Sequence, residues 1–280
     1  MRLELEQLLK GDVSFDYHSK VRPNACEASA VKSALELISR LEVRAHFCHL
    51  STLEAVGMIR KEKYLAKREN KSLCLHARSL PITCFSLQET GKGSGFGKMN
   101  PPLRSSHSIK ALVNGLNDGT IDMVASDHAP HLESEKDADI RAAPSGVPGV
   151  ETLMPLMLAA VRKNILPLSQ MIMVTSRNPA KAFGLDRLGK GRLEVGFDAD
   201  LMIVDPRNLQ HKADMLHSKA GWTPFEGMDA VFPEYTLSRG EVIWMEESIN
   251  ARPGRGKFLE GSGKRSKEDE EEDYEETGSE

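Results

Sequence analysis

The amino-acid sequence predicts an α/β fold followed by a small unit of β structure. Over most of the chain, amphipathic helical stretches alternate with short apolar strands, a pattern typical of a parallel sheet covered by helices. From about residue 189, short β segments punctuated by glycine replace that alternation. The 280 residues, 40% of them hydrophobic, are enough to bury a substantial core.

The elements follow one another in a regular order. Helices are expected where apolar residues recur at a spacing of three or four, and strands where short apolar runs lie between them. The predicted helices are residues 25–42, 51–70 (capped by Ser51 or Thr52), 108–119, 149–164 and 167–184, and the predicted strands are 43–50, 120–127, 189–206 and 234–246. One stretch, "KSLCLHARSLPITCFSLQETG" at residues 71–91, shows no hydrophobic period and no turn chemistry.

Composition and charge exclude several classes of protein. The net charge of −4 comes from the acidic end of the chain, where three basic and nine acidic residues follow Gly263; we expect residues 251–280 to be a disordered acidic tail. The remainder has no basic excess that would indicate nucleic acid. Cys26, Cys48, Cys74 and Cys84 form no CxxC pair, which indicates a reduced cytoplasm. No apolar run is long enough for a membrane span.

Polar residues that suit catalysis follow two predicted strands. "HFCHLST" offers His46 and His49, which lie on opposite faces of a strand; we favour His49, at the carboxyl end, although a buried structural histidine is the alternative. In "ASDHAPHLESEK", Asp127 suits metal binding or proton transfer and His131 suits an anionic substrate; the alternative is a polar loop that happens to be rich in histidine.

Two further segments could line a pocket. "KMNPPLR" places Asn100 before two prolines, which fix an extended backbone. "APSGVPGVE" could present backbone N–H and C=O groups to a ligand. Each could equally be an ordinary turn.

Together these segments resemble dihydroorotases of the amidohydrolase superfamily. "SDHAPHLESEK" is similar to that family's second signature, "HLST", "NPPLR", "PSGVPGVE" and "TPFEG" occur in the family's order, and "GRLEVGFDADLMIVD" resembles the superfamily's C-terminal β-sandwich segment. The resemblance implies the C-terminal half of a (β/α)8 barrel, about strands 5–8, in residues 1–188, and a β-sandwich segment in residues 189–250.

By resemblance, the reaction is the zinc-dependent, reversible hydrolysis of dihydroorotate to N-carbamoyl-L-aspartate in pyrimidine biosynthesis. It implies one or two zinc ions, with His49 and Asp127 as ligands and Asp127 also as general base. It further implies that Asn100, His131 and the backbone of Ser145 and Gly146 bind substrate.

The chain departs from the family's pattern in two places. The HxH pair of the first barrel strand is missing, so Met1 is expected to fall near the end of the fourth β/α unit, and half a barrel with two unpaired edges is not expected to fold stably alone. In another reading frame, chosen codons for residues 74–87 give "LAREVTPHHLLLP", similar to the family's sixth-strand histidine segment. We therefore hypothesise a local frameshift around residues 72–94, which resequencing of the coding DNA would test; a divergent loop is the alternative.

Three functions remain open at this stage. The first is a dihydroorotase, impaired in the chain as written, with a small-molecule substrate. The second is a non-catalytic, dihydroorotase-like subunit that scaffolds aspartate carbamoyltransferase or forms a homo-oligomer. The third is another cyclic amidohydrolase, a hydantoinase or an allantoinase. No nucleic-acid or membrane partner is expected.

Overall fold

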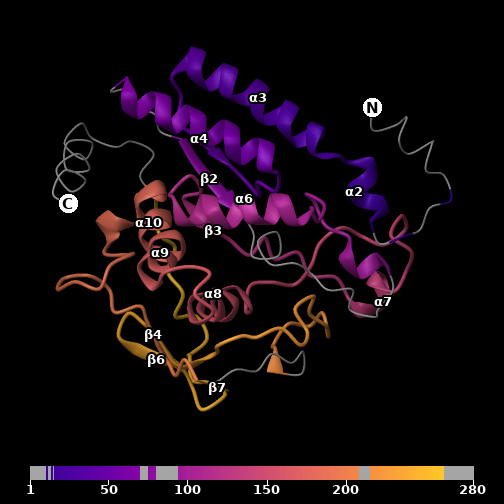
Figure 1. The fold of residues 1–280 in the computed structure, drawn as a ribbon. Coiled ribbons are helices and arrows are strands. Elements are labelled where there is room, and N and C mark those ends of the chain that lie inside the picture. The colour runs from indigo at the N-terminus through magenta and orange to yellow at the C-terminus, as the bar shows by residue number, and fades with distance from the viewer. Residues whose placement is uncertain are drawn as a thin grey trace. The chain divides into compact units, whose positions relative to one another are not determined.

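The computed structural model describes residues 11, 14, 16–69, 75–79, 94–207 and 215–261. The chain divides into two compact units, the first made of Met1–Val174 with Asp205–Phe232 and the second of Thr175–Val204 with Pro233–Glu280. Figure 1 shows the course of the chain.

The first unit is built on a three-stranded parallel sheet in the order β1-β2-β3. The strands are β1 (Ala45–Phe47), β2 (Leu75–Ser79) and β3 (Met123–Val124). In the register, His46 pairs with His76 and Arg78 with Met123. Among the described residues this sheet is open and not a closed barrel, since β1 and β3 each pair with β2 alone.

Helices follow these strands in the α/β order expected from the sequence. They are α2 (Tyr17–Val21), α3 (Asn24–Leu41), α4 (Leu53–Arg68), the 3-10 helix η1 (Ser94–Gly97), α6 (Ser106–Asn117), α7 (Glu133–Lys136), α8 (Leu153–Arg162) and α9 (Leu168–Ile172). The hydroxyl of Thr52 accepts the N–H of Ala55 and caps α4. In Figure 1, α3, α4 and α6 lie side by side near β2.

Two apolar clusters fix the helices on the sheet. In the first, Leu75 and Ala77 of β2 pack with buried residues of α3 and α4, among them Leu35 and Ile59. In the second, residues from β3, α4, α6, α8 and α9 pack together; they include Val56, Leu112, Val124, Met157 and Met171. The apolar stripes that predicted the helices are therefore the surfaces that bind them to the sheet.

The description of residues 71–91 as lacking any period was wrong for residues 75–79. Those five residues form β2, the central strand, with Leu75, Ala77 and Ser79 buried and His76 and Arg78 half-buried. A five-residue strand containing a serine and two basic residues gives too weak an apolar alternation to be recognised from sequence. The other residues of the segment lie outside the described ranges, and the frameshift stays a prediction.

The second unit contains an antiparallel sheet in the order β4-β5-β6-β7. Its strands are β4 (Leu201–Val204), β5 (Pro233–Ser238), β6 (Glu241–Met245) and β7 (Ser248–Ile249), and it also contains α10 (Asn178–Phe183) and the 3-10 helix η3 (Asp186–Leu188). Arg239 and Gly240 both have positive φ, as a two-residue hairpin turn between β5 and β6 requires. The segment 167–184, predicted as one helix, comprises α9, the π-helix η2 (Met173–Arg177) and α10.

Two expectations concern the chain as a whole. No helix in the described ranges is long and apolar enough to cross a membrane. Of the predicted acidic tail, residues 251–261 contain no helix or strand, and residues 262–280 lie outside the described ranges.

Candidate active site

The two residues favoured at strand ends lie at the same edge of the parallel sheet. His49 follows β1 by two residues and Asp127 follows β3 by three. Both have left-handed backbones, with φ of 40° at His49 and 47° at Asp127. Residues other than glycine adopt such φ values rarely, and they cluster at functional sites.

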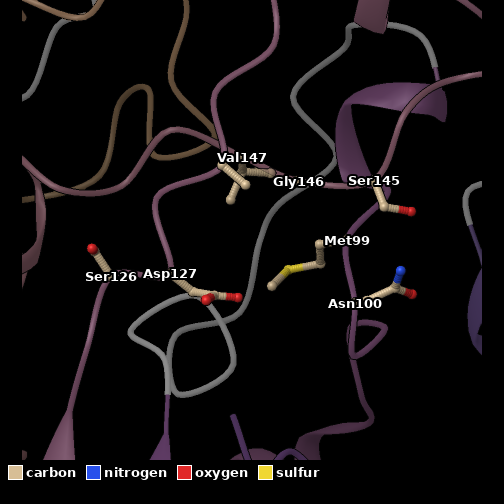
Figure 2. A pocket seen from close by; sticks show the side chains of 8 residues that line it. Met99, Asn100, Ser126, Asp127, Ser145, Gly146 and Val147 are labelled. Atoms are coloured by element: carbon tan, nitrogen blue, oxygen red, sulfur yellow. The ribbon is translucent and has the colours of Figure 1, made fainter. Parts of the chain in front are cut away.

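Asp127 opens into a cavity of about 200 Å³ in the first unit. Its lining residues are Met99, Asn100, Ser126, Asp127, Ala129, Ser145, Gly146 and Val147. Figure 2 shows the Met99 side chain between Asp127 on one side and Asn100 and Ser145 on the other. Four residues selected from the sequence, Asn100, Asp127, Ser145 and Gly146, therefore line one cavity.

The other two candidates do not line this cavity. His131 Nε2 lies 3.3 Å from the carbonyl oxygen of Ser145. His49 lines a second cavity, of about 480 Å³, and Asn100 lines that one as well. Asn100 is thus common to the two cavities at this edge of the sheet.

A buried histidine fixes the orientation of the Asn100 amide. His18 Nε2 lies 2.9 Å from Asn100 Oδ1, and Arg22 Nη1 lies 3.0 Å from His18 Nδ1. Burial lowers the pKa of His18 to about 4, so its ring is neutral at pH 7. Because Arg22 can only donate, His18 Nδ1 is the acceptor and Nε2–H donates to Asn100 Oδ1. The Asn100 amide nitrogen is then the group left to donate to a ligand.

Gly146 is required by the shape of the cavity wall. Its φ is 134°, and a Cβ atom built there would lie 2.7 Å from the Ala129 carbonyl oxygen. The Gly146 N–H donates to the Lys98 carbonyl at 3.0 Å, and the Gly146 carbonyl accepts from Lys136 Nζ at 3.1 Å. These bonds join the loop of Gly146 to the loop that carries Asn100.

A carboxylate that lines the second cavity holds the segment that follows His49. Glu27 of α3 accepts from the backbone N–H and hydroxyl groups of both Ser51 and Thr52. The Arg104 guanidinium, whose side chain is 4% exposed, lies 3.7 Å from Glu27. The arginine of "NPPLR" therefore pairs with a carboxylate of α3.

The described residues do not by themselves fit a metal ion. They contain no group of three or more His, Cys, Asp or Glu side chains that could hold one, whereas catalytic zinc sites use three protein ligands. In addition, Arg78 Nη2 of β2 lies 3.7 Å from Asp127 Oδ1. The carboxylate proposed from sequence as a ligand thus already faces a fixed positive charge.

Four side chains around the cavity were not singled out from the sequence, namely His18, Arg78, Lys136 and Trp222. Lys136 is the last residue of "ASDHAPHLESEK", and Trp222 directly precedes "TPFEG". Their place in or beside these motifs was the only sequence signal for a role at the site. His18 and Arg78 lie in stretches that gave none, since their roles come from contacts with residues far along the chain.

Curated relatives resemble this chain over most or all of its length. A protein named dihydroorotase from Methanosarcina acetivorans is 86% identical and is aligned over 100% of this chain and 60% of its own. One of the same name from Halobacterium salinarum is 43% identical, over 86% of this chain and 54% of its own. The chain therefore spans no more than about 60% of the length of these relatives.

Solved structures and a family profile agree with that resemblance. A D-hydantoinase structure matches with a TM-score of 0.84 and 26% identity, over 93% of this chain and 58% of its own. The L-hydantoinase of Arthrobacter aurescens matches with a TM-score of 0.78 and 29% identity, over 89% and 56%. The model of the amidohydrolase family matches residues 12–243. This chain belongs to the amidohydrolase family.

Proposed function

We propose that this chain carries part of the active site of a dihydroorotase. The observation that carries the proposal is the 86% identity to a protein of that name, together with one cavity that gathers Asn100, Asp127, Ser145 and Gly146. Because the chain spans 60% of that relative, the activity is proposed for the protein of full length.

Asp127 is proposed as the general base. Hydrolysis of dihydroorotate breaks the C–N bond of a ring amide, adds the hydroxyl of water to the carbonyl carbon and places a proton on the leaving nitrogen. A carboxylate that is 42% exposed at the rim of a cavity can take the proton from water and return it to that nitrogen. The left-handed backbone at Asp127 sets the direction in which its side chain leaves the loop.

The substrate is proposed to bind through the loops around the cavity. The amide nitrogen of Asn100, oriented by His18, can donate to a ring carbonyl. Ser145 and Gly146 line the same cavity, and His131, which lies against the Ser145 carbonyl, can donate to the substrate carboxylate. The cavity volume of about 200 Å³ admits a ring of this size.

Zinc binding is proposed only for the protein of full length. His49 and Asp127 have the imidazole and carboxylate groups that zinc accepts, and we assign them as two of its ligands. Since the described residues supply no third, the remaining ligands must come from residues outside those ranges.

Two observations favour the other candidate functions. The likeness to hydantoinase structures is compatible with another cyclic amide as substrate. The Arg78–Asp127 pair and the incomplete ligand set are compatible with a non-catalytic subunit that binds aspartate carbamoyltransferase or a second copy of itself.

The two units are proposed to be parts of the family's barrel and of its β-sandwich. Residues 1–188 would be about strands 5–8 of a (β/α)8 barrel, residues 189–250 a β-sandwich segment, and residues 251–280 an acidic tail. The parallel sheet of the first unit and the antiparallel sheet of the second support the first two assignments. The protein would act in the cytoplasm.

Ligand binding tests the function without requiring turnover. Titration of dihydroorotate, hydantoin and allantoin into the purified chain should show a preference for dihydroorotate. His131→Ala should weaken that binding by at least about tenfold, because it removes a hydrogen bond to a charged group. His107→Ala, at an exposed position of α6, is the matched control and should change nothing.

The outcomes separate the three functions. A preference for hydantoin or allantoin would replace the proposed substrate. If no ring binds but aspartate carbamoyltransferase co-elutes with the chain, the non-catalytic role replaces the proposed one.

A further inference from the structure

Among the described residues of the first unit, the largest fully buried side chain is a lysine. Lys136, at the end of α7, is 0% exposed, although lysines are almost never fully buried unless they are paired. No carboxylate pairs with it within the described ranges. Its ammonium donates instead to three backbone carbonyls, those of Lys98 at 3.0 Å, Pro144 at 2.9 Å and Gly146 at 3.1 Å.

These three carbonyls belong to the two loops that line the cavity of Asp127. Lys98 is two residues before Asn100, and Pro144 and Gly146 flank Ser145. The Lys98 carbonyl also accepts the Gly146 N–H, so Lys136 binds at the point where the loops join. Lys136 itself closes the segment that begins with Asp127, and one ammonium thus holds three segments together.

An aromatic side chain completes the surroundings of the ammonium. The Lys136 Nζ atom lies 5.7 Å from the centre of the Trp222 ring, within the range of a cation–π contact. Trp222 Nε1 donates to the His131 carbonyl at 2.8 Å, and its ring packs edge-on against Phe96 at 5.0 Å. Trp222 therefore ties the segment of His131 to the same point.

We propose that Lys136 is a positioning residue, which sets the distance between the Asn100 loop and the Ser145–Gly146 loop and so shapes the cavity beside Asp127. The positive charge of Lys136 is needed for this role, because three carbonyl dipoles that point at one spot repel one another unless a cation lies between them. The loops also meet through apolar contacts, because Met99 and Val147 belong to one buried cluster with Trp222; the ammonium adds polar bonds that this cluster cannot supply. The inference deepens the proposed function, and it concerns loop geometry whether or not that function is correct.

Hydrogen exchange in Lys136→Met tests the proposal directly. Methionine keeps most of the side-chain volume and removes the ammonium, so three carbonyls lose their donor. The Gly146 amide, bonded to the Lys98 carbonyl, should exchange at least about tenfold faster, while amides of α4 keep their rates. Lys110→Met is the matched control, because Lys110 is exposed on α6 and lies outside both loops; it should leave the Gly146 amide unchanged.

A measurement on the unaltered chain guards against a variant that does not fold. In ¹⁵N spectra of lysine ammonium groups, Lys136 should give a signal that is protected from exchange with water, unlike exposed lysines such as Lys61. An unprotected Lys136 ammonium, or a Gly146 amide that exchanges equally in folded Lys136→Met, would overturn the proposal.

Dihydroorotate binding then separates the two proposals. If Lys136→Met loosens the loops and weakens dihydroorotate binding, both stand. If the loops loosen but even the unaltered chain binds no dihydroorotate, the proposed function fails and the positioning role of Lys136 stands.

Discussion

Zinc affinity is the property in which this chain should differ most from an intact metalloenzyme. Structural sites with four protein ligands bind zinc with about 10–16 kcal/mol, or about 2.5–4 kcal/mol for each ligand. His49 and Asp127 alone should then contribute about 5–8 kcal/mol, which corresponds to a Kd between about 0.2 mM and 1 µM.

The Arg78 guanidinium should weaken the binding further. At an assumed separation of about 5 Å, a zinc ion and the guanidinium would repel each other in water by about 1.7 kcal/mol before screening by salt. Since Asp127 is 42% exposed, the value for water is the appropriate one. Arg78→Met should therefore tighten zinc binding by about fivefold to tenfold, and Asp127→Asn should weaken it.

Equilibrium dialysis against buffered zinc, with the bound metal measured by mass spectrometry, checks these values. The unaltered chain should bind zinc no more tightly than about 1 µM and should show no turnover of dihydroorotate. Stoichiometric binding with a nanomolar Kd, or an affinity that Asp127→Asn leaves unchanged, would show that the ligand set has been wrongly assigned.

Three other substitutions test how the site is supported, each by urea unfolding of the chain. Glu27→Gln should lower the free energy of unfolding by about 3 kcal/mol, because it leaves the buried Arg104 without its counter-charge; an unchanged midpoint would contradict this. The pKa of His18 is lowered to about 4 by burial from about 6.5 when unfolded, so the unfolded state binds more protons between these values. The free energy of unfolding should therefore rise with pH across that window by up to about 3 kcal/mol. In His18→Gln this rise should be absent, and its absence in the unaltered chain would refute the assignment. Gly146→Ala should cost about 1–3 kcal/mol, and more than Gly119→Ala, since a Cβ at Gly146 meets the Ala129 carbonyl whereas one at Gly119 meets nothing within 4 Å.

The helices could be predicted from sequence because their signals are local. The helix predicted at residues 25–42 is α3 (Asn24–Leu41), and the one predicted at 51–70 is α4 (Leu53–Arg68), capped by Thr52. Each has an apolar stripe several turns long, and one end of each is marked by a capping residue or a proline. The helix at 108–119 likewise ends before Gly119, whose φ is 76°.

The strands were less predictable because they are short and depend on their neighbours. β3 is the two residues Met123–Val124 within a predicted strand of eight. β2 was not predicted, since only its place between β1 and β3 makes Ala77 and Ser79 core residues. Burial of this kind is decided by contacts far along the chain, which a local pattern does not contain.

The same distinction explains what was predicted and what was missed at the site. Residues with reactive groups, such as Asp127 and Asn100, could be selected by chemistry alone, because few side chains suit proton transfer or amide recognition at a strand end. The groups that orient them, His18 and Lys136, have no such signature, since any role they play exists only once distant loops meet. A motif such as "ASDHAPHLESEK" therefore combines two kinds of residue: an acid that faces the cavity, and a lysine nine residues later whose ammonium faces the backbone that forms the cavity wall.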